Sequence, residues 1–195
     1  MTTHVMIDLE TMGARPGSAI LSIGAVRFDP CGAPPPDPAC GLTADHLSVN
    51  VSLDSCLGVG LRVDADTVAW WMHPDRAAGR EALFGPDAAP AMALRDALDR
   101  LSGFVPRGAR VWAHGATFDP VLLETAYRAT RANCPWRFWQ VRDTRTLFEL
   151  AFPPDGKKAG LANDHTALGD AYRQACAVQR AYAKLGLVPS PADAA

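Results

Sequence analysis

Val5-Met6-Ile7-Asp8-Leu9-Glu10-Thr11-Met12-Gly13 is a short apolar stretch that carries two carboxylates where a buried strand ordinarily carries none. Side chains alternate between the two faces of a strand, so Asp8 and Glu10 project from one face, roughly 7 Å apart along the chain. Two carboxylates on one desolvated face resist ionisation unless a proton or a cation compensates them, and hard divalent cations prefer oxygen ligands. The stretch therefore predicts a metal-binding face, with a solvent-exposed edge strand as the alternative.

Composition describes a globular protein without a strong overall charge. The chain has 195 residues, 48% of them hydrophobic, and its 19 basic and 21 acidic side chains give a net charge of -2. This length predicts a single domain with a substantial core. Since there is no global positive field, any phosphate-binding surface has to be local.

The sequence also lacks the signals of a membrane protein, a secreted protein, a disulfide framework and a structural zinc site. No run approaches the length of a membrane span, and the first residues lack the basic start and apolar stretch of a secretion signal, so we expect a cytoplasmic protein. The five cysteines form no CxxC pair, which argues against a disulfide framework and against a structural zinc site.

The first third of the chain predicts an antiparallel meander. Residues 19–28 follow the first strand after a short turn and are expected to pair with it, and residues 46–51 alternate as a third strand. Between them, residues 29–45 contain five prolines and almost no periodicity, which is typical of an exposed loop insertion.

The next segment predicts helices. A short helix is expected from Asp64 or Asp66 through Trp70-Trp71, a second over 75–83, and an amphipathic helix over 87–104. Adjacent residues do not share one helical face, which allows one tryptophan in the core and the other free to contact a ligand, but core packing of both is the favoured interpretation.

The remainder alternates strand and helix. Residues 110–113 and 138–142 are expected as strands, each followed by a helix, and a final helix begins near His165 and continues to about residue 184. The expected fold class is α/β: a five-stranded mixed sheet, with a three-strand antiparallel meander and two parallel strands, flanked by helices. We expect a single domain over residues 1–186 and a short flexible tail over 187–195.

Three polar residues in this part also have purely structural interpretations. Asp119 stands before Pro120 at the start of a predicted helix, where an aspartate accepts backbone N–H bonds. His165 and Asp170 lie five residues apart at the start of the last helix, where a helix cap and a surface group are the usual assignments.

The combined pattern of Asp8-x-Glu10, Asp119 and His165-x4-Asp170 resembles the DEDDh family of 3'-5' exonucleases, which has the ribonuclease-H-like fold. The three motifs occur in the family's order over nearly the whole chain. The segments most similar to a bacterial and phage subgroup of 3'-5' exoribonucleases are Trp70-Trp71, residues 112–119, 135–139 and 143–147. Met12 and Gly115 depart from the pattern, because the family often has Thr and Asn there, which affects substrate contacts more than the reaction.

The resemblance implies five catalytic residues and a pair of Mg²⁺ or Mn²⁺ ions. Asp8 would bridge both ions, Glu10 and Asp170 would complete the site that activates water, and Asp119 would help hold the second ion. His165 would be the general base, since an imidazole pKa of about 6.5 suits proton abstraction near neutral pH. Two cations about 4 Å apart activate the water and neutralise the phosphate.

The implied reaction is the stepwise release of 5'-mononucleotides from a single-stranded or overhanging RNA 3' end. Unstacked bases and backbone phosphates are expected to contact aromatic and basic side chains. The expected substrate-binding residues are Thr11, Met12, Trp70, Trp71, His114, Phe118, Arg142 and Arg145, with Lys157 and Lys158 nearby. For the basic residues, ordinary solvated surface is the alternative.

Other functions stay open. A 3'-5' exodeoxyribonuclease of the same family would have the same five residues, because only contacts to the 2'-hydroxyl distinguish the two sugars. A non-catalytic module that binds single-stranded nucleic acid is expected to lack at least one of the five, and none is missing. A homodimer is also expected from the resemblance, with the Trp-rich segments as either its interface or part of the core.

Overall fold

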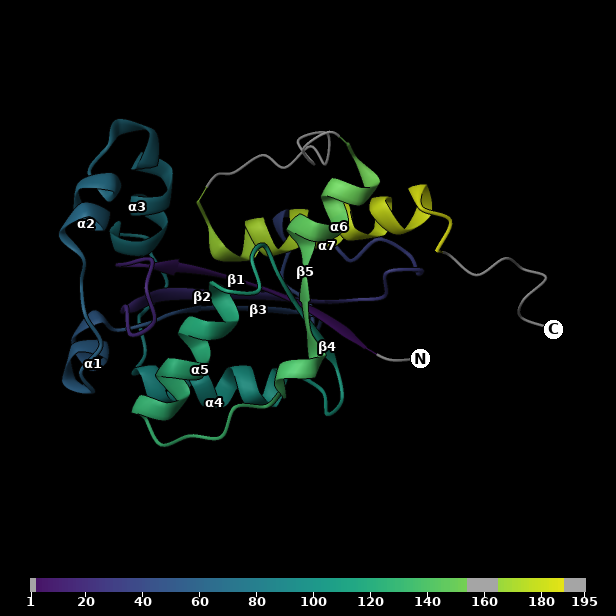
Figure 1. Ribbon diagram of the computed structural model, residues 1–195. Helices are drawn as coiled ribbons and strands as arrows, with labels where there is room; N and C mark the ends of the chain where they lie inside the picture. Colours follow the sequence, from purple (N-terminus) through teal and green to yellow (C-terminus); the bar gives the residue numbers. More distant parts are fainter. Residues whose placement is uncertain (1–2, 154–164, 188–195) are drawn as a thin grey trace.

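A computed structural model describes residues 3–153 and 165–187. Its centre is a five-stranded sheet in the order β3-β2-β1-β4-β5 (Figure 1). The first three strands pair antiparallel, β4 runs parallel to β1, and β5 runs parallel to β4. The strands are β1 (His4–Thr11), β2 (Ile20–Phe28), β3 (His46–Asn50), β4 (Arg110–Ala113) and β5 (Val141–Asp143). The predicted meander followed by two parallel strands is confirmed.

Helices cover both faces of the sheet. The α-helices are α1 (Leu53–Gly58), α2 (Ala65–Trp71), α3 (Ala77–Phe84), α4 (Leu94–Phe104), α5 (Asp119–Ala129), α6 (Thr144–Ala151) and α7 (Ala167–Lys184). Short 3-10 turns are η1 (Pro38–Cys40), η2 (Pro74–Arg76) and η3 (Phe138–Gln140). Helices α4 and α5 lie against one face, α6 and α7 against the other, and α2 and α3 stand at one end (Figure 1).

Strand β1 divides its side chains between the two layers. Val5 and Ile7 are buried with the leucines of α4 and α5, whereas Met6 is buried with the alanines of α7. By alternation, Asp8 and Glu10 share the face of Met6 and point toward α7. The same-face prediction is confirmed, and the edge-strand alternative is wrong because β1 lies between β2 and β4.

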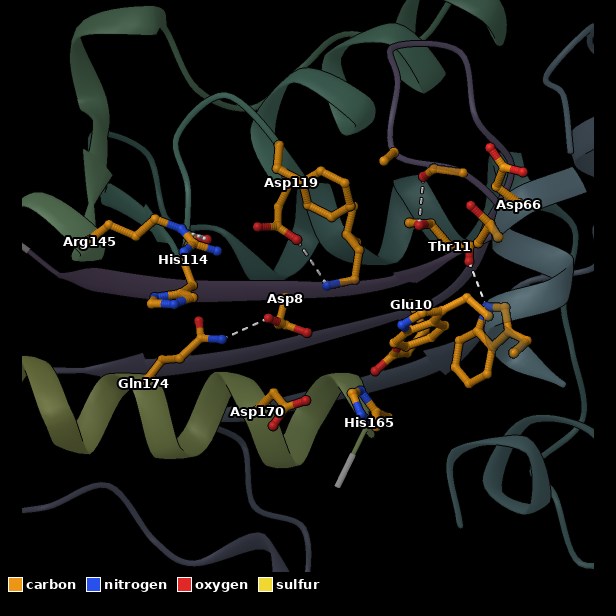
Figure 2. A pocket seen from close by; sticks show the side chains of 17 residues that line it. Asp8, Glu10, Thr11, Asp66, His114, Asp119, Arg145, His165, Asp170 and Gln174 are labelled. Carbon is orange, nitrogen blue, oxygen red and sulfur yellow. Dashed lines mark hydrogen bonds between the residues drawn. The ribbon is translucent and has the colours of Figure 1, made fainter. Parts of the chain in front are cut away.

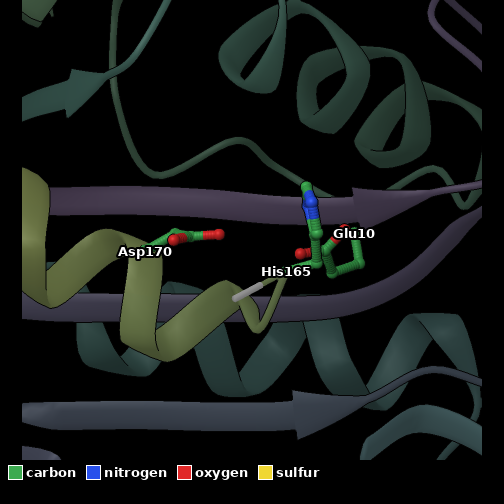
Figure 3. A group of neighbouring side chains, drawn as sticks. All are labelled: Glu10, His165 and Asp170. Carbon is green, nitrogen blue, oxygen red and sulfur yellow. The ribbon is translucent and has the colours of Figure 1, made fainter. Parts of the chain in front are cut away.

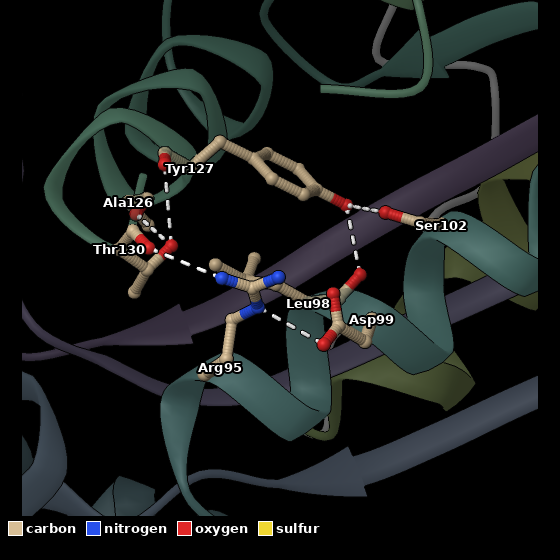
Figure 4. Close-up of polar contacts among 7 residues, drawn as sticks. All are labelled: Arg95, Leu98, Asp99, Ser102, Ala126, Tyr127 and Thr130. Carbon is tan, nitrogen blue, oxygen red and sulfur yellow. Dashed lines mark hydrogen bonds and ion pairs between the residues drawn. The ribbon is translucent and has the colours of Figure 1, made fainter. Parts of the chain in front are cut away.

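The layer opposite α7 is fixed by polar contacts between α4 and α5 (Figure 4). The Tyr127 hydroxyl donates to the Leu98 carbonyl at 3.0 Å and lies 3.0 Å from the Ser102 hydroxyl. Arg95 forms a 2.9 Å ion pair with Asp99 on the same helix. Because the buried phenol is hydrogen-bonded, α5 is held in register with α4 and the first residue of α5 has a fixed place beside the sheet.

Two predicted elements have wrong boundaries. Residues 138–140 form a 3-10 turn instead of the start of a strand, because the Gln140 side chain bonds both Arg137 N and the Ala109 carbonyl and turns the chain. The helix predicted from residue 87 begins at Leu94, because Met92 pairs with Asn50 and Ser52 at the sheet edge. Helix α1 was not predicted.

Other predictions agree more closely with the structure. The predicted helix over 75–83 is a 3-10 turn followed by α3, and residues 29–45 lack strands and α-helices, with only the turn η1. All five cysteines are free. Within 3–153 and 165–187, no helix has both the length and the apolar character needed to cross a membrane. The predicted tail lies outside the described residues from 188 onward, and the single-domain boundary stays a prediction.

Candidate active site

A pocket of ≈ 670 Å³ opens at the end of the sheet beside the start of α7 (Figure 2). The five residues of the predicted catalytic set all line it: Asp8, Glu10, Asp119, His165 and Asp170. They come from β1, from the first residue of α5 and from the start of α7, segments that are far apart in the sequence. The fold therefore brings the three motifs into one cavity.

A glycine allows α7 to approach the carboxylates. Gly24 on β2 pairs with Asp8 in the sheet register. A Cβ atom on Gly24 would lie 2.2 Å from the carbonyl carbon of Ala167 and 2.2 Å from the backbone nitrogen of Leu168. Because the first turn of α7 rests directly on this glycine, Asp170 lies on the same face as Asp8.

Glu10, His165 and Asp170 form a tight cluster (Figure 3). One potential ligand atom from each lies within 4.8 Å of the others. Both carboxylates are buried, with 7% of each residue exposed, and Arg173 forms an ion pair with Asp170. Two acids and an imidazole at these separations make a set of donors that fits a divalent cation.

His165 is held in an unusual backbone conformation. Its φ angle is +57°, which L residues adopt rarely. The Trp70 ring lies edge-on at 5.0 Å between centroids, and a Cβ on Gly79 of α3 would lie 2.8 Å from the His165 carbonyl oxygen. Helices α2 and α3 therefore support His165 through Trp70 and Gly79.

The other two carboxylates are strongly perturbed. Burial raises the pKa of Asp8 well above its usual value, and the charges of Asp119, Asp170 and Glu10 raise it further. Burial also raises the pKa of Asp119 to about 7, against the opposing effects of backbone hydrogen bonds and Arg145. Carboxylates this close repel one another as anions, and a divalent cation removes that repulsion.

Asp119 does not cap its own helix. It is the first residue of α5, but its Oδ1 accepts a 3.2 Å hydrogen bond from Leu9 N on β1 (Figure 2). No side-chain capping bond is present at the start of α5. The purely structural interpretation of Asp119 as a helix cap is wrong, and the residue instead ties α5 to the strand of Asp8 and Glu10.

The sequence matches the family described as the 3'-5' exoribonuclease Rv2179c-like domain over residues 3–182. The chain belongs to this family. Among curated proteins it is 24% identical over 167 residues to an exodeoxyribonuclease of Enterobacteria phage T4, a match that covers 74% of this chain and 70% of the relative.

Solved structures show the same ribonuclease-H-like exonuclease fold. A zinc-bound complex of E. coli exonuclease I with single-stranded DNA matches with a TM-score of 0.64 at 14% identity, covering 96% of this chain and 42% of that one. The RNase domain of yeast Pop2 gives 0.62 at 13%, covering 97% and 80%, and the cell-death related nuclease CRN-4 gives 0.60 at 13%, covering 95% and 65%. The chain thus spans less than half of the exonuclease I chain.

Most of the predicted substrate-binding residues line this pocket. Those present are Thr11, Trp70, Trp71, His114, Phe118 and Arg145. Met12 and Arg142 are not among the lining residues: Met12 packs against the core, and Arg142 donates to the carbonyls of Trp139 and Val141 at 2.9 Å and 2.8 Å. Lys157 and Lys158 lie outside the described residues.

The two adjacent tryptophans have different environments. Trp71 is 3% exposed and donates from Nε1 to the Thr11 carbonyl at 2.9 Å, which fixes the end of β1. Trp70 is 40% exposed, and the Arg76 guanidinium lies 4.5 Å from its ring centre. The favoured interpretation, packing of both in the core, is wrong, and the alternative of one buried and one accessible tryptophan is confirmed.

His114 is a neutral imidazole in the part of the pocket away from His165 (Figure 2). Burial and the nearby Arg145 lower its pKa to about 4. Its Nδ1 lies 2.8 Å from the Thr144 hydroxyl, which donates to the Ala113 carbonyl, and Arg145 Nε donates to the His114 carbonyl at 3.1 Å. The following Gly115 has φ +127°, a conformation that glycine adopts readily and other residues rarely adopt.

Sequence reasoning missed three polar residues of the pocket, Asp66, Thr67 and Gln174. Gln174 donates from Nε2 to Asp8 Oδ1 at 2.8 Å. A signal for it existed, since it follows Asp170 by four residues and interrupts the alanine-rich face of α7. Asp66 stands in the first turn of α2, where the sequence predicts only a helix cap.

Proposed function

We propose that this pocket hydrolyses phosphodiester bonds at the 3' end of single-stranded or 3'-overhanging RNA by the DEDDh two-metal mechanism, releasing nucleoside 5'-monophosphates. The observation that carries the proposal is the meeting of Asp8, Glu10, Asp119, Asp170 and His165 in a single pocket. The family membership over residues 3–182 supports the same reaction.

The donors fit Mg²⁺ or Mn²⁺. Four carboxylates supply hard oxygen ligands, and no cysteine lines the pocket among the described residues. Asp8 would bridge two ions, Glu10 and Asp170 would complete one site, and Asp119 would help hold the other. Bound there, the cations would make water more acidic and neutralise charge on the phosphate.

His165 would act as the general base. Its side chain lies in the same cluster as Glu10 and Asp170, so a water held by those carboxylates is within its reach. A base has to be near the proton that it abstracts, and its backbone support from α3 keeps it there. The imidazole accepts the proton, and the pocket's carboxylates stabilise the resulting imidazolium.

The remaining lining residues would position the strand. Trp70 and Phe118 offer aromatic surface for stacking by a terminal base, and Arg145 offers a cation for a backbone phosphate. In Figure 2, Arg145 lies beside His114, and His165, whose ring contacts Trp70, lies on the other side of Asp8 and Asp170. A strand would therefore place its scissile phosphate between the aromatic and basic contacts.

DNA is the second candidate substrate. The T4 relative is an exodeoxyribonuclease, and the exonuclease I structure contains single-stranded DNA. The five proposed catalytic residues would serve either sugar, so that the preference depends on contacts to the 2'-hydroxyl. The expected homodimer is likewise tested directly, by sedimentation of the purified chain.

The test is a time course on matched 5'-labelled RNA and DNA single strands with Mg²⁺ or Mn²⁺, and with EDTA as the control. We expect a metal-dependent ladder that shortens from the 3' end, faster for RNA. Asp8→Asn should abolish it, whereas Asp99→Asn, an exposed acid on α4 paired with Arg95, should leave it unchanged. If the DNA ladder shortens faster, DNA becomes the preferred substrate and RNA the second candidate. Normal hydrolysis by Asp8→Asn would overturn the metal-site assignment.

A further inference from the structure

Gln174 is a buried amide with only one half of its hydrogen-bonding capacity used. It lies on α7, one turn after Asp170, and is 6% exposed. Its Nε2 donates to Asp8 Oδ1 at 2.8 Å, but its Oε1 is buried and has no hydrogen-bond partner within the described parts of the chain. Buried carbonyl oxygens are nearly always paired in folded proteins, so this exception calls for a donor.

The position itself does not require a polar residue. Apart from Asp170, the buried residues of α7 around Gln174 are apolar, and they include Ala171, Ala175 and Val178. A methionine or leucine would fill the same space without leaving an amide carbonyl unpaired, which costs folding free energy. The glutamine therefore fits a role in the pocket better than a role in packing.

Asp8 and His114, the groups on either side of this amide, are acceptors when Asp8 is ionised. Figure 2 shows Gln174 between Asp8 and His114 on the wall of the pocket. Ionised Asp8 only accepts. The Thr144 hydroxyl donates to the Ala113 carbonyl, so its oxygen takes the hydrogen of His114 Nδ1, and neutral His114 then presents an acceptor at Nε2. Because no described group donates to this oxygen in the structure, a bound ligand is the expected source of the missing donor.

A hydrated divalent cation brings such donors. Mg²⁺ gives up its waters reluctantly and keeps several when carboxylates bind it, and those waters direct their hydrogens outward. Asp8, the proposed bridging ligand, is already in contact with Gln174. A water bound to a cation at Asp8 would therefore lie close to the unpaired oxygen and would donate a hydrogen bond to it.

We propose that Gln174 is a positioning residue for the cation: its amide nitrogen fixes one oxygen of Asp8, and its carbonyl oxygen accepts a hydrogen bond from the cation's hydration water. This inference rests on the proposed function, because it needs a cation at Asp8. Mutation of groups that orient metal ligands in this way typically lowers metal affinity or activity about 10- to 100-fold.

The experiment measures Mn²⁺ binding by calorimetry in the full chain without nucleic acid. Gln174→Met keeps the shape and removes both polar groups, and Gln174→Asn keeps the amide but withdraws it by one methylene. Gln179→Met is the matched control, since Gln179 lies on the same helix but bonds to the carbonyls of Asp29 and Ala33, away from the pocket. We expect about a tenfold or greater loss of Mn²⁺ affinity for Gln174→Met, a smaller loss for Gln174→Asn and none for the control.

Kinetics on RNA give the second measurement. Gln174 is proposed to act on the cation and not on the strand, so kcat should fall at fixed Mn²⁺ while KM for RNA stays within about twofold, and raising Mn²⁺ should recover part of the loss. The melting temperature in EDTA should match wild type, with a smaller rise on adding Mn²⁺. Should Gln174→Met fail to fold, Gln174→Asn supplies both measurements.

The outcomes separate this inference from the proposed function. If wild type binds Mn²⁺ and degrades RNA but both Gln174 variants bind Mn²⁺ like the control, the inference is wrong and the proposed function stands. If the variants keep their metal affinity but lose discrimination between RNA and DNA, Gln174 reads the sugar and the inference is also overturned. If wild type neither binds Mn²⁺ nor shortens RNA, both fall together.

Discussion

Gly24 on the second strand and Ala167 at the start of the last helix are in backbone contact, with no space for a side chain between them. Gly24 is also the partner of Asp8 in the sheet. This one contact therefore sets the distance between the helix that carries Asp170 and the strand that carries Asp8. The geometry of the pocket depends on a residue that has no functional group.

Replacing this glycine should damage the pocket more than its small size suggests. In Gly24→Ala, the new Cβ would meet backbone atoms of Ala167 and Leu168 at 2.2 Å, and backbone cannot rotate away. We expect a loss of about 1–3 kcal/mol in the free energy of unfolding from overpacking, and at least about a 100-fold fall in kcat from the displaced carboxylates. Urea denaturation and single-turnover assays measure the two effects.

Gly103→Ala is the control for this change. Gly103 lies on α4 with nothing within 4 Å of the added Cβ. There the substitution should leave activity unchanged and stabilise the helix by up to about 1 kcal/mol. Equal activity in the two variants would contradict the proposed role of Gly24.

A second glycine positions His165. In Gly79→Ala, the Cβ would lie 2.8 Å from the His165 carbonyl oxygen and 3.0 Å from the Trp71 ring. Alanine favours the helix, so a purely local effect would be stabilising by up to about 1 kcal/mol. We expect instead a drop in kcat of about tenfold or more with an altered pH–rate profile, because the proposed base moves.

The comparison variant is Gly58→Ala at the end of α1, where nothing lies within 4 Å of the added Cβ. Steady-state kinetics from about pH 6 to about pH 9 distinguish the variants. A Gly79→Ala enzyme with the wild-type kcat and pH profile would show that α3 does not position His165.

Trp70 should contribute to substrate binding more than to chemistry. It is the accessible member of the tryptophan pair, and stacking of one base on an aromatic ring is worth about 1–3 kcal/mol. We expect Trp70→Ala to raise KM for RNA about 5- to 150-fold with a smaller effect on kcat. Phe138→Ala removes an aromatic ring that is 81% exposed and away from the pocket lining, and KM should not change.

The stability of the protein in EDTA should depend on pH through Asp119. Its folded pKa of about 7 lies above the unfolded value of about 4, so the folded state holds a proton that the unfolded chain has released. This contribution to the free energy of unfolding is present at low pH and is lost as pH rises from about 4 toward about 7. The melting temperature of wild type should therefore fall relative to that of Asp119→Asn as the pH rises from about 5 to about 7.5.

Two conditions make this measurement specific. His114 acts in the opposite direction, since its folded pKa of about 4 lies below the unfolded value of about 6.5, but it is present in both proteins and cancels in the difference. Adding Mn²⁺ should reduce the pH dependence of wild type by stabilising the ionised carboxylates. Parallel melting curves for wild type and Asp119→Asn in EDTA would show that Asp119 ionises normally in the fold.

The sequence alone determined the sheet and the composition of the candidate site. Alternation in β1 put Asp8 and Glu10 on one face, and the order of Asp119, His165 and Asp170 matched a family pattern over the whole chain. The first inference depends on local periodicity, which a strand keeps whatever surrounds it. The second depends on the resemblance to the family pattern, in which these residue types occur in this order.

The tertiary structure decided which neighbours of those residues share the pocket. Met12 and Arg142 were expected at the substrate and lie elsewhere, while Gln174 and Asp66 line the pocket without having been expected. The start of α4 was also set by pairing of Met92 at the sheet edge, against its local helical pattern. Contacts between segments far apart in the chain fix these positions, and no local periodicity encodes such contacts.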